Sequence, residues 1–337
     1  MIRAGIVGVT GYGGRELFRL LHPHPEVDVV AAVSSSAAGQ RLDAVLPQFR
    51  ALTNLELTAF DPDALAAACD VVFVGVPGAE SMAMVRALRG AGVRVIDIGP
   101  DFRLKDTAKF KQYYKHDHGA PELLPEAVYG YVPMSRDALP GASLVAVPGC
   151  YPISILTPLR PLLGAPIDPR SIVINAVSGV SGAGRSPSEA FHFPEMNENL
   201  KAYKVGVHQH IPEIEQALDH TWTVQYTPHV VSITRGIHTT IVLRPERDFD
   251  PAPYYACYDR EPFVRVLGEG VLPEVKYVKG SNFIDFGWVR DARTGNLLLL
   301  SAIDNLVGGT AGMAVQCMNL MFGVEETTGL RAGGLAP

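Results

Sequence analysis

The sequence has few cysteines, and none is spaced for a metal site or a disulfide framework. Four occur in 337 residues, Cys69, Cys150, Cys257 and Cys317, with no C-x-x-C pair among them. Zinc knuckles need such pairs, and disulfide scaffolds are shorter and much richer in cysteine. We therefore predict no metal site and no disulfides, and we expect at most one of these thiols to be chemically special.

Long hydrophobic runs and blocks of one charge are also missing. No segment reaches the roughly 20 apolar residues of a membrane helix, and the N-terminus lacks the pattern of a signal peptide. The 29 basic and 35 acidic residues give a net charge of −6 without a basic stripe. We therefore expect a cytoplasmic protein whose partners include neither membrane nor nucleic acid.

A chain of this length suggests about two domains. Over residues 1–148, short apolar segments alternate with helical patterns, as in a parallel sheet covered by helices on both faces. This predicts an α/β Rossmann-type domain. Its strands are expected at 2–9, 27–33, 71–76, 93–98 and 144–147, and its helices at 14–21, 62–68 and 80–91.

The texture changes after Pro148. Longer segments rich in β-branched residues follow, several without an intervening helix, and they are expected as strands at 171–178, 224–234, 239–244 and 296–303. This predicts, over 149–309, an α+β domain with a mixed, largely antiparallel sheet. A helix is expected to follow at 310–321.

A glycine-rich turn follows the first expected strand. The spacing of Gly8, Gly11 and Gly14 is G-x-x-G-x-x-G, a variant of the dinucleotide-binding fingerprint. Glycines there let the backbone approach a pyrophosphate, which the N-terminus of the next helix then binds. The residues expected to contact a dinucleotide are Gly8, Thr10, Gly11, Tyr12, Gly13 and Gly14.

The end of the second expected strand bears on the choice of dinucleotide. NAD sites commonly place an acid there to hold the ribose hydroxyls. This chain has Ser34, Ser35 and Ser36 instead, with Arg41 shortly after. Because hydroxyls can donate to a phosphate, we predict NADP as cofactor, with contacts from Ser34 and Ser35.

Cys150 lies in a second turn, Val147-Pro148-Gly149-Cys150-Tyr151-Pro152, ahead of an apolar helix expected at 153–163. A helix N-terminus favours a thiolate and offers N–H groups to an oxyanion. The other three cysteines are interpreted as packing residues. Beside a nicotinamide site, such a thiolate predicts attack on an activated carbonyl, with hydride reduction of the resulting thioester to an aldehyde.

The best partner for Cys150 is the pair His208 and His210, within 205–215. In an extended segment the two imidazoles would share one face. Either could pair with the thiol or protonate a leaving oxygen. For one of the two, a packing role is the better interpretation.

A glycine-serine loop at 178–185 follows an expected strand. Its successive N–H groups and Arg185 could hold a phosphate or a carboxylate, although a hairpin or interface loop is an equal alternative. The candidate substrate-binding residues here are Ser178, Gly179, Ser181, Gly182 and Arg185.

Taken together, these motifs resemble the N-acetyl-γ-glutamyl-phosphate reductases of arginine biosynthesis. The resemblance runs from Gly5 to about Leu330. It is carried by segments 8–17, 101–104, 148–152, 178–185, 197–200, 203–208, 234–236, 280–283 and 302–306.

The resemblance implies reduction of N-acetyl-glutamyl 5-phosphate by NADPH to the semialdehyde, with Cys150 as nucleophile. One histidine of the pair is implied as acid–base, and we favour His210. It also implies that Asn305 lies near the nicotinamide, that a helix at 310–330 packs back on the nucleotide domain, and that the chain forms homodimers or homotetramers.

Two positions depart from the family pattern. The family often has an arginine where this chain has Ser34–Ser36, and usually a threonine where it has Ile153. A sister family reduces a carrier-protein-bound aminoadipyl phosphate for lysine synthesis, and its cysteine turn tends to read Gly-Cys-Asn. Gly149-Cys150-Tyr151-Pro152 favours the arginine side, with the lysine-pathway enzyme and a non-catalytic NADP-binding protein as alternatives.

Overall fold

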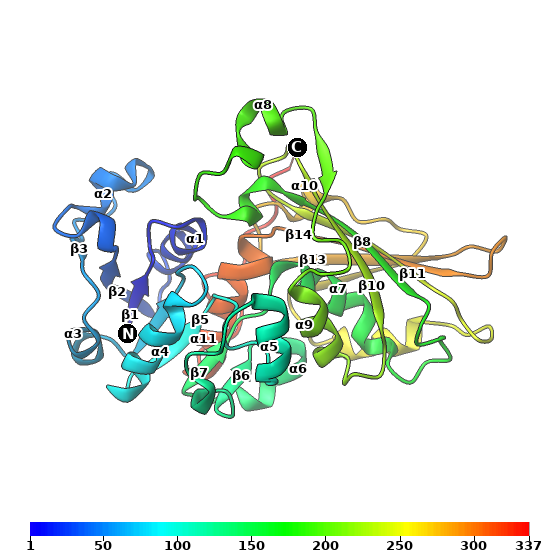
Figure 1. The fold of residues 1–337 in the computed structure, drawn as a ribbon, viewed down its shortest axis with the longest axis horizontal. Helices are drawn as coiled ribbons and strands as arrows, with labels where there is room; N and C mark the ends of the chain where they lie inside the picture. Colours follow the sequence, from blue (N-terminus) through cyan, green and yellow to red (C-terminus); the bar gives the residue numbers. More distant parts are fainter. Residues whose placement is uncertain (337) are drawn as a thin grey trace. The chain divides into compact units, whose positions relative to one another are not determined.

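The computed structural model describes residues 1–336, which form two compact units. The first unit comprises 1–148 and 310–331, and the second comprises 149–309 and 332–336. Figure 1 shows the elements of both. The chain thus leaves the first unit after Pro148 and returns to it at Thr310.

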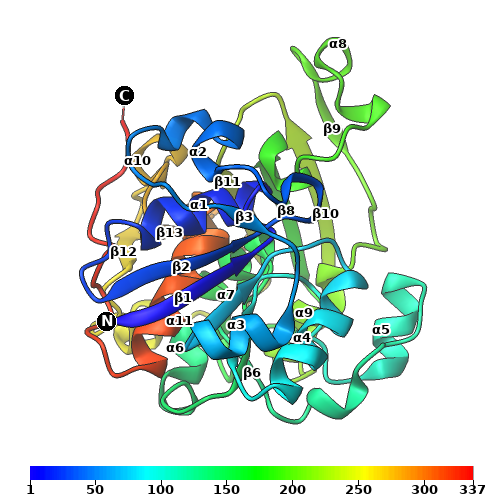
Figure 2. The same ribbon diagram turned by 90° about the vertical axis from the view of Figure 1, so that its left-hand side faces the viewer.

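The first unit is built on a seven-stranded sheet in the order β3-β2-β1-β4-β5-β7-β6, with every pairing parallel. Figure 2 brings β1 and β2 to the front. The strands are β1 Ile2–Val7, β2 Val27–Val33, β3 Leu57–Thr58, β4 Val71–Val74, β5 Arg94–Asp97, β6 Ala127–Tyr129 and β7 Leu144–Ala146. All four residues of β4 are buried, as expected for a strand covered on both faces.

Helices connect these strands. They are α1 Tyr12–Leu21, α2 Leu42–Val45, α3 Pro62–Ala68, α4 Glu80–Gly90, α5 Thr107–Tyr114, α6 Val132–Ser135 and, from the C-terminal segment, α11 Gly312–Met321. Asp61 caps α3 by accepting from the N–H groups of Asp63 and Ala64, as its sequence predicts. A short π-helix, Val307–Ala311, precedes α11.

The second unit holds another seven-stranded sheet, in the order β12-β13-β14-β11-β8-β10-β9. Only the β8–β10 and β12–β13 pairings are parallel among its described strands. The strands are β8 Ile172–Gly179, β9 Leu200–Ala202, β10 Val224–Val231, β11 Ile237–Leu243, β12 Val264–Glu269, β13 Ile284–Arg290 and β14 Leu297–Ile303. The helices are α7 Cys150–Leu159, α8 Phe193–Met196, α9 His210–Ala217 and α10 Val275–Val278.

The predicted fold class is confirmed. A Rossmann-type parallel sheet is joined to an α+β unit whose mixed sheet is largely antiparallel. The strands missed from sequence are β3, β6, β9, β12 and β13. Of these, β3 and β6 have only two and three residues, which is too short for a periodic pattern.

Helix α7 corrects one expected boundary. The helix was expected at 153–163 but runs Cys150–Leu159, so Cys150 is its first residue. Proline is tolerated in the first turn of a helix, where its missing N–H has no intrahelical partner, so Pro152 does not delay the start. The helix packs against β11, β13 and β14, and its residues after Cys150 are all buried.

Candidate functional site

The glycine turn in the first unit has the shape that its spacing predicts. Gly8 adopts a positive φ of 84°, and a Cβ there would lie 2.3 Å from the carbonyl oxygen of Gly75. A Cβ at Gly14 would lie 2.3 Å from the carbonyl oxygen of Gly8. Gly8 is therefore required where the turn meets the residue after β4, and Gly14 is required where helix α1 packs on the turn itself.

This turn fits the pyrophosphate of a dinucleotide. Helix α1 begins at Tyr12 with Gly11 as its N-cap, and no side chain caps its first turn. The N–H groups and the positive end of the helix dipole are thus available to an anion. Thr10, Tyr12 and Gly13 are half-buried around this turn.

The end of β2 carries hydroxyls and no carboxylate. Ser34 is buried, with its Oγ 3.3 Å from the Oγ1 of Thr10, while Ser35 is exposed at the start of a short turn. Arg41 pairs with Asp43 and also donates to Asn54. The two serines therefore lie beside the glycine turn, whereas the guanidinium of Arg41 is held by other groups.

In the second unit, Cys150 differs from the other thiols. It is half-buried at the start of α7. Cys69 and Cys317 are buried, and burial raises the pKa of Cys69 to about 11 and also raises that of Cys317. Cys257 is exposed, so the expectation that it packs in the interior is wrong.

Two contacts fix the turn that holds Cys150. The Gly149 N–H donates to Oε1 of Glu213 at 2.8 Å, and Glu213 is only 1% exposed. On another side, a Cβ built on Gly309 would lie 2.8 Å from the Cβ of Cys150. The buried carboxylate of Glu213 on α9 and the backbone of Gly309 thus fix the position of Cys150.

His208 and His210 lie together, but not as expected. The segment is not extended: 205–209 is largely turn and His210 begins α9. The two rings still meet, with centroids 4.6 Å apart, because the His210 N–H donates to Nδ1 of His208 at 3.1 Å. The two rings are thus brought together by the start of a helix after Gln209, and not by the alternation of side chains along a strand.

The two imidazoles have different environments. His208 is 2% exposed and its Nδ1 accepts a backbone hydrogen bond at the start of α9. Burial, and after it the charge of Lys204, lowers the pKa of His208 to about 3. His208 is therefore neutral at physiological pH and acts locally as a helix cap.

Three tyrosines that the sequence reasoning did not single out enclose this cluster. Tyr151 donates to the His229 carbonyl at 2.9 Å, and Tyr203 donates to the Tyr151 hydroxyl at 3.4 Å. The buried hydroxyl of Tyr226 has no hydrogen-bond partner, and burial raises its pKa. Its ring lies 5.4 Å from that of His208. Tyr151 and Tyr203 lie in segments 148–152 and 203–208, which carry the family resemblance, whereas Tyr226 lies in no such segment.

Glu213 was missed for a different reason. It lies three residues after His210, which puts the two on one face of a helix. That signal appears only once 210–217 is assigned as helical.

The 178–185 loop is anchored at one end and open at the other. Ser181 accepts from Nδ2 of Asn305 at 3.0 Å, while Oδ1 of Asn305 accepts from the Gly236 N–H at 2.8 Å. Ser178 donates to the Gly179 carbonyl. Gly182 and Arg185 are exposed. The loop is therefore a fixed turn ending in an exposed guanidinium.

Asp304 organises the neighbouring segment. This fully buried carboxylate accepts from the N–H groups of Gly280, Leu306 and Val307 and pairs with Arg235 at 3.5 Å. It thereby fixes the segment that carries Asn305.

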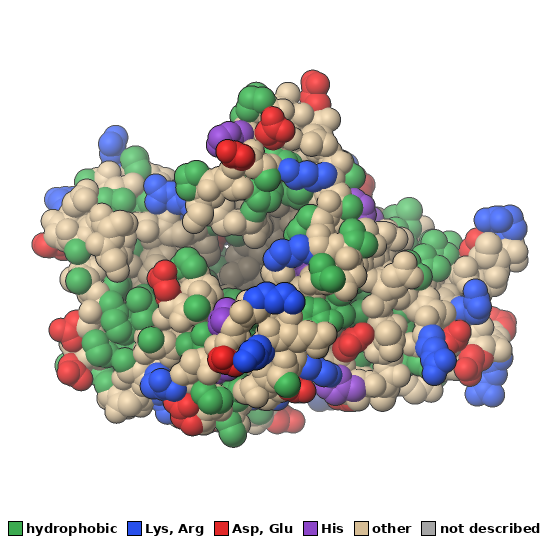
Figure 3. All heavy atoms as spheres, in the orientation of Figure 1, with side chains coloured by type: hydrophobic (Ala, Val, Ile, Leu, Met, Phe, Trp, Pro, Cys, Tyr) green, Lys and Arg blue, Asp and Glu red, His purple; other side chains and the backbone are tan. Residues whose placement is uncertain are grey.

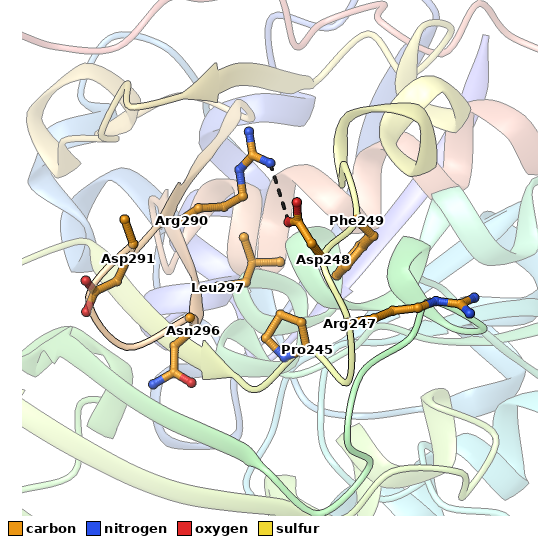
Figure 4. A pocket seen from close by; sticks show the side chains of 10 residues that line it. Pro245, Arg247, Asp248, Phe249, Arg290, Asp291, Asn296 and Leu297 are labelled. Atoms are coloured by element: carbon orange, nitrogen blue, oxygen red, sulfur yellow. Dashed lines mark ion pairs between the residues drawn. The ribbon is translucent and has the colours of Figure 1, made fainter.

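A cavity of about 480 Å³ lies elsewhere in the second unit, between the segments after β11 and β13. Figure 4 shows its apolar floor of Pro245 and Leu297, with Arg290 reaching toward Asp248 at 3.9 Å. Figure 3 shows charged side chains gathered around the end of this unit. Cys150, His208 and His210 do not line this cavity.

Among residues 1–336, no three His, Cys, Asp or Glu side chains lie close enough together to hold a metal ion. No helix in that range is long and apolar enough to cross a membrane.

Two family models match this chain, one in each of its two units. Residues 3–142 match the family model "Semialdehyde dehydrogenase, NAD binding domain", and residues 150–305 match "Semialdehyde dehydrogenase, dimerisation domain". The N-acetyl-gamma-glutamyl-phosphate reductase of Desulforudis audaxviator is 48% identical, with 100% of both chains covered.

The chain belongs to the N-acetyl-gamma-glutamyl-phosphate reductase family. A second member, from Symbiobacterium thermophilum, is 47% identical over 99% of this chain and 98% of its own. The predicted resemblance is therefore confirmed, and the chain is an oxidoreductase with an NAD(P)-binding domain and a dimerisation domain.

Solved structures show the fold of this reductase family in more distant proteins. Aspartate semialdehyde dehydrogenase II from Vibrio cholerae matches with a TM-score of 0.70 at 17% identity, covering 95% of this chain and 98% of its own. The aspartate semialdehyde dehydrogenase with NADP from Candida albicans matches with the same TM-score and identity. At this identity the likeness concerns the fold.

Proposed function

We propose that the chain reduces N-acetyl-L-glutamyl 5-phosphate to N-acetyl-L-glutamate 5-semialdehyde, using NADPH and a thioester on Cys150. The observation that supports this most directly is Cys150 as first residue of α7, in the same unit as the His208–His210 pair. Family membership supplies the substrate, since the relatives carry the name of that reductase.

Cys150 is the proposed nucleophile. Its thiolate attacks the acyl carbon, the C–O bond to phosphate breaks, and phosphate leaves with the electron pair. A dinucleotide held by the glycine turn at Gly8, Gly11, Gly13 and Gly14 would supply the hydride that reduces the thioester carbon. Collapse of the resulting thiohemiacetal breaks the C–S bond and releases the aldehyde. The N–H groups at the start of α7 stabilise the oxyanion in both steps.

His210 is the proposed acid–base. It takes the thiol proton before attack and protonates the thiohemiacetal oxygen during reduction. His208 is assigned to positioning, because its Nδ1 already accepts the His210 N–H and its pKa is lowered to about 3. Glu213 holds the Gly149 backbone and so fixes the angle at which Cys150 is presented.

NADP is the proposed dinucleotide. Gly8, Gly11, Gly13 and Gly14, with Thr10 and Tyr12, hold the pyrophosphate. Ser34 and Ser35 stand where NAD enzymes place an acid, and their hydroxyls can donate to a 2′-phosphate. A comparison of kcat/KM for NADPH and NADH tests this choice, and equal values would contradict it.

The 178–185 loop is the proposed substrate-anion site. The Ser181 hydroxyl can donate to the anion, and Gly182 and Arg185 are exposed beside it. Ser178 and Gly179 shape the turn, because the Ser178 hydroxyl donates to the Gly179 carbonyl and the Gly179 N–H donates to the Gly236 carbonyl. Asn305 is proposed to lie near the nicotinamide, with its amide oriented by Ser181 and Gly236.

The reaction is tested most directly in reverse. Purified protein is given N-acetyl-glutamate semialdehyde, phosphate and NADP, and NADPH is followed by absorbance. We expect phosphate-dependent turnover with this substrate and little with aspartate semialdehyde. Preference for a carrier-protein-bound aminoadipate semialdehyde would instead assign the chain to the lysine-pathway activity.

Cys150→Ser is the matched test of the covalent step, with Cys257→Ser as its control. We expect C150S to lose turnover by about 10³-fold or more while still binding NADPH, because serine is a far weaker nucleophile. C257S should resemble the wild type, since Cys257 lies in the exposed part of the segment Ala252–Tyr258 and has no proposed role. Unchanged turnover in C150S would eliminate the thioester.

The chain is proposed to form a homodimer or homotetramer through the open face of its second sheet. Half-buried Val173, Val242 and Leu298 form a row across β8, β11 and β14, on the face opposite the fully buried residues. Light scattering after size-exclusion chromatography should give two or four chains; a monomer would contradict this.

A further inference from the structure

The loops after β1, β4 and β5 meet in the first unit. The Gly75 carbonyl closes on Gly8, and the side chain of Ile98 lies 2.9 Å and 2.8 Å from the Cβ positions of Gly13 and Gly75. β1 stands between β2 and β4, where the strand order reverses. Doubly wound sheets bind their ligands in the crevice at that point. The segment 75–79 after β4 is therefore one wall of the dinucleotide site.

This wall is held in an unfavourable conformation. Ala79, the N-cap of α4, has a φ of +72°, a region that residues with a Cβ rarely adopt. Its N–H donates to Oδ2 of Asp101 at 2.9 Å, and the Ser81 hydroxyl donates to the same oxygen at 2.6 Å. Asp101 thus offsets the strain and supplies the cap that α4 lacks from its own N-cap residue.

Asp101 is itself fixed and buried. Its exposed fraction is 0%, and its carbonyl accepts from Nε2 of His118 at 2.9 Å. Its Oδ1 would lie 3.3 Å from a Cβ at Gly78, so the carboxylate packs directly against the wall. It belongs to the segment after β5 and therefore ties two neighbouring loops together.

We propose that Asp101 is a positioning residue for dinucleotide binding. It acts through Ala79 and Ser81 by holding segment 75–80 in the shape that receives the cofactor next to the glycine turn. Because the Asp101 carboxyl group occupies the start of α4, the start of α1 is left as the place for the pyrophosphate. The inference rests on the dinucleotide-binding domain and is independent of the Cys150 chemistry.

Asp101→Ala tests this in the full-length protein. We expect its Kd for NADPH, measured by fluorescence titration, to rise about tenfold, as loss of two hydrogen bonds to a buried carboxylate implies. NADH is titrated in parallel, so a wrong choice of dinucleotide does not obscure the result. The rate at which iodoacetamide alkylates Cys150 without cofactor should stay unchanged, because Cys150 lies in the other unit.

Asp106→Ala is the matched control. Asp106 caps α5 by accepting from the N–H groups of Ala108 and Lys109, so its loss also removes a side-chain cap from a helix start. D106A should lose stability without a change in Kd. Asp101→Asn keeps an acceptor oxygen and should recover most of the affinity. Ser81→Ala removes only the hydrogen bond from the Ser81 hydroxyl to Asp101 and should raise the Kd about two- to threefold. It replaces D101A as the test variant if D101A does not fold.

The proposal is overturned if D101A, or S81A where D101A does not fold, binds NADPH like the wild type. It is equally overturned if D106A shows the same rise in Kd as D101A at the same loss of Tm, since the effect would then be general destabilisation.

Discussion

Two neighbouring histidines, His208 and His210, differ in their hydrogen bonds because their surroundings differ. Their rings are 4.6 Å apart, yet His208 is committed through Nδ1 to the start of α9 and its pKa is lowered to about 3. Proton transfer near neutral pH needs a group that can change charge there. The assignment of roles within the pair therefore follows from a backbone hydrogen bond.

His210→Asn and His208→Asn separate these roles. We expect H210N to lower kcat by about 10²- to 10⁴-fold and to remove the corresponding limb of the pH–rate profile. Asparagine can accept the backbone hydrogen bond that Nδ1 of His208 accepts, so H208N should keep most of the activity and the profile. The reverse pattern in steady-state kinetics across pH would exchange the roles.

Asp97 provides a second prediction at this scale. Burial, and after it the charge of Asp101, raises the pKa of Asp97 to about 7, against an opposing effect of Arg103. The folded state therefore retains a proton that the unfolded chain has lost above about pH 4. Stability from this residue falls as pH rises from about 4 to 7, by up to roughly 1.4 kcal/mol per pH unit.

Asp97→Asn should flatten that dependence and raise Tm at pH 8, since the amide oxygen can still accept the Gly99 N–H. Thermal unfolding of both proteins between pH 5 and 8 measures the difference. Parallel curves over this range would show that Asp97 is already ionised in the folded protein.

At the scale of elements, the start of α7 shows how distant segments fix the place of one side chain, the proposed nucleophile Cys150. The N–H of Gly149, the N-cap of α7, donates to Glu213 of α9. Gly309, in the π-helix that precedes α11, has no side chain and so lets the backbone pass beside the Cys150 side chain. Tight packing around the first turn leaves the sulfur little choice of position. The position of Cys150 therefore depends on segments far apart in sequence.

Gly309→Ala tests this packing. A Cβ there would stand 2.8 Å from that of Cys150, so one backbone must move, and we expect kcat to fall at least tenfold with a destabilisation of about 1–3 kcal/mol. Gly90→Ala, where no atom lies within 4 Å of the added Cβ, is the control and should keep full activity. Wild-type kinetics in G309A would show that the site tolerates the shift.

At the scale of the whole molecule, the first unit is closed by residues that follow the second in sequence. Helix α11 packs against α1, and Oδ1 of Asn319 accepts from His24 at 3.1 Å. Nine of the ten residues of α11 are buried, so the unit built by 1–148 is incomplete without them.

A chain ending after Gly309 should therefore lose the first unit. Each buried apolar side chain contributes about 1.5–3 kcal/mol, and several together approach the total stability of a domain. We expect loss of NADPH binding and rapid proteolysis of 1–148. A chain ending after Arg331 removes only residues of the second unit and should bind NADPH normally. Binding by both truncated chains would contradict this account.

Much of this architecture was predictable from the sequence because it depends on local patterns. Continuous apolar strands such as 71–74, the glycine spacing at 8–14 and the cap at Asp61 each depend on neighbours within a few residues. The turn around Cys150 and the hydroxyls at the end of β2 were found in the same way.

What local patterns could not supply was decided by tertiary contacts. The helical start at His210, the burial of Glu213 and of Asp101, and the closeness of Gly309 to Cys150 each join segments that are far apart in the chain. Sequence alone determined the family and the sheet types and singled out Cys150 as the proposed nucleophile, since these follow from periodicity and short motifs. Only the folded structure decided that the His208 imidazole caps the start of α9 and that the Asp101 carboxyl group holds the loop after β4. Burial and hydrogen-bond partners are properties of the packed chain.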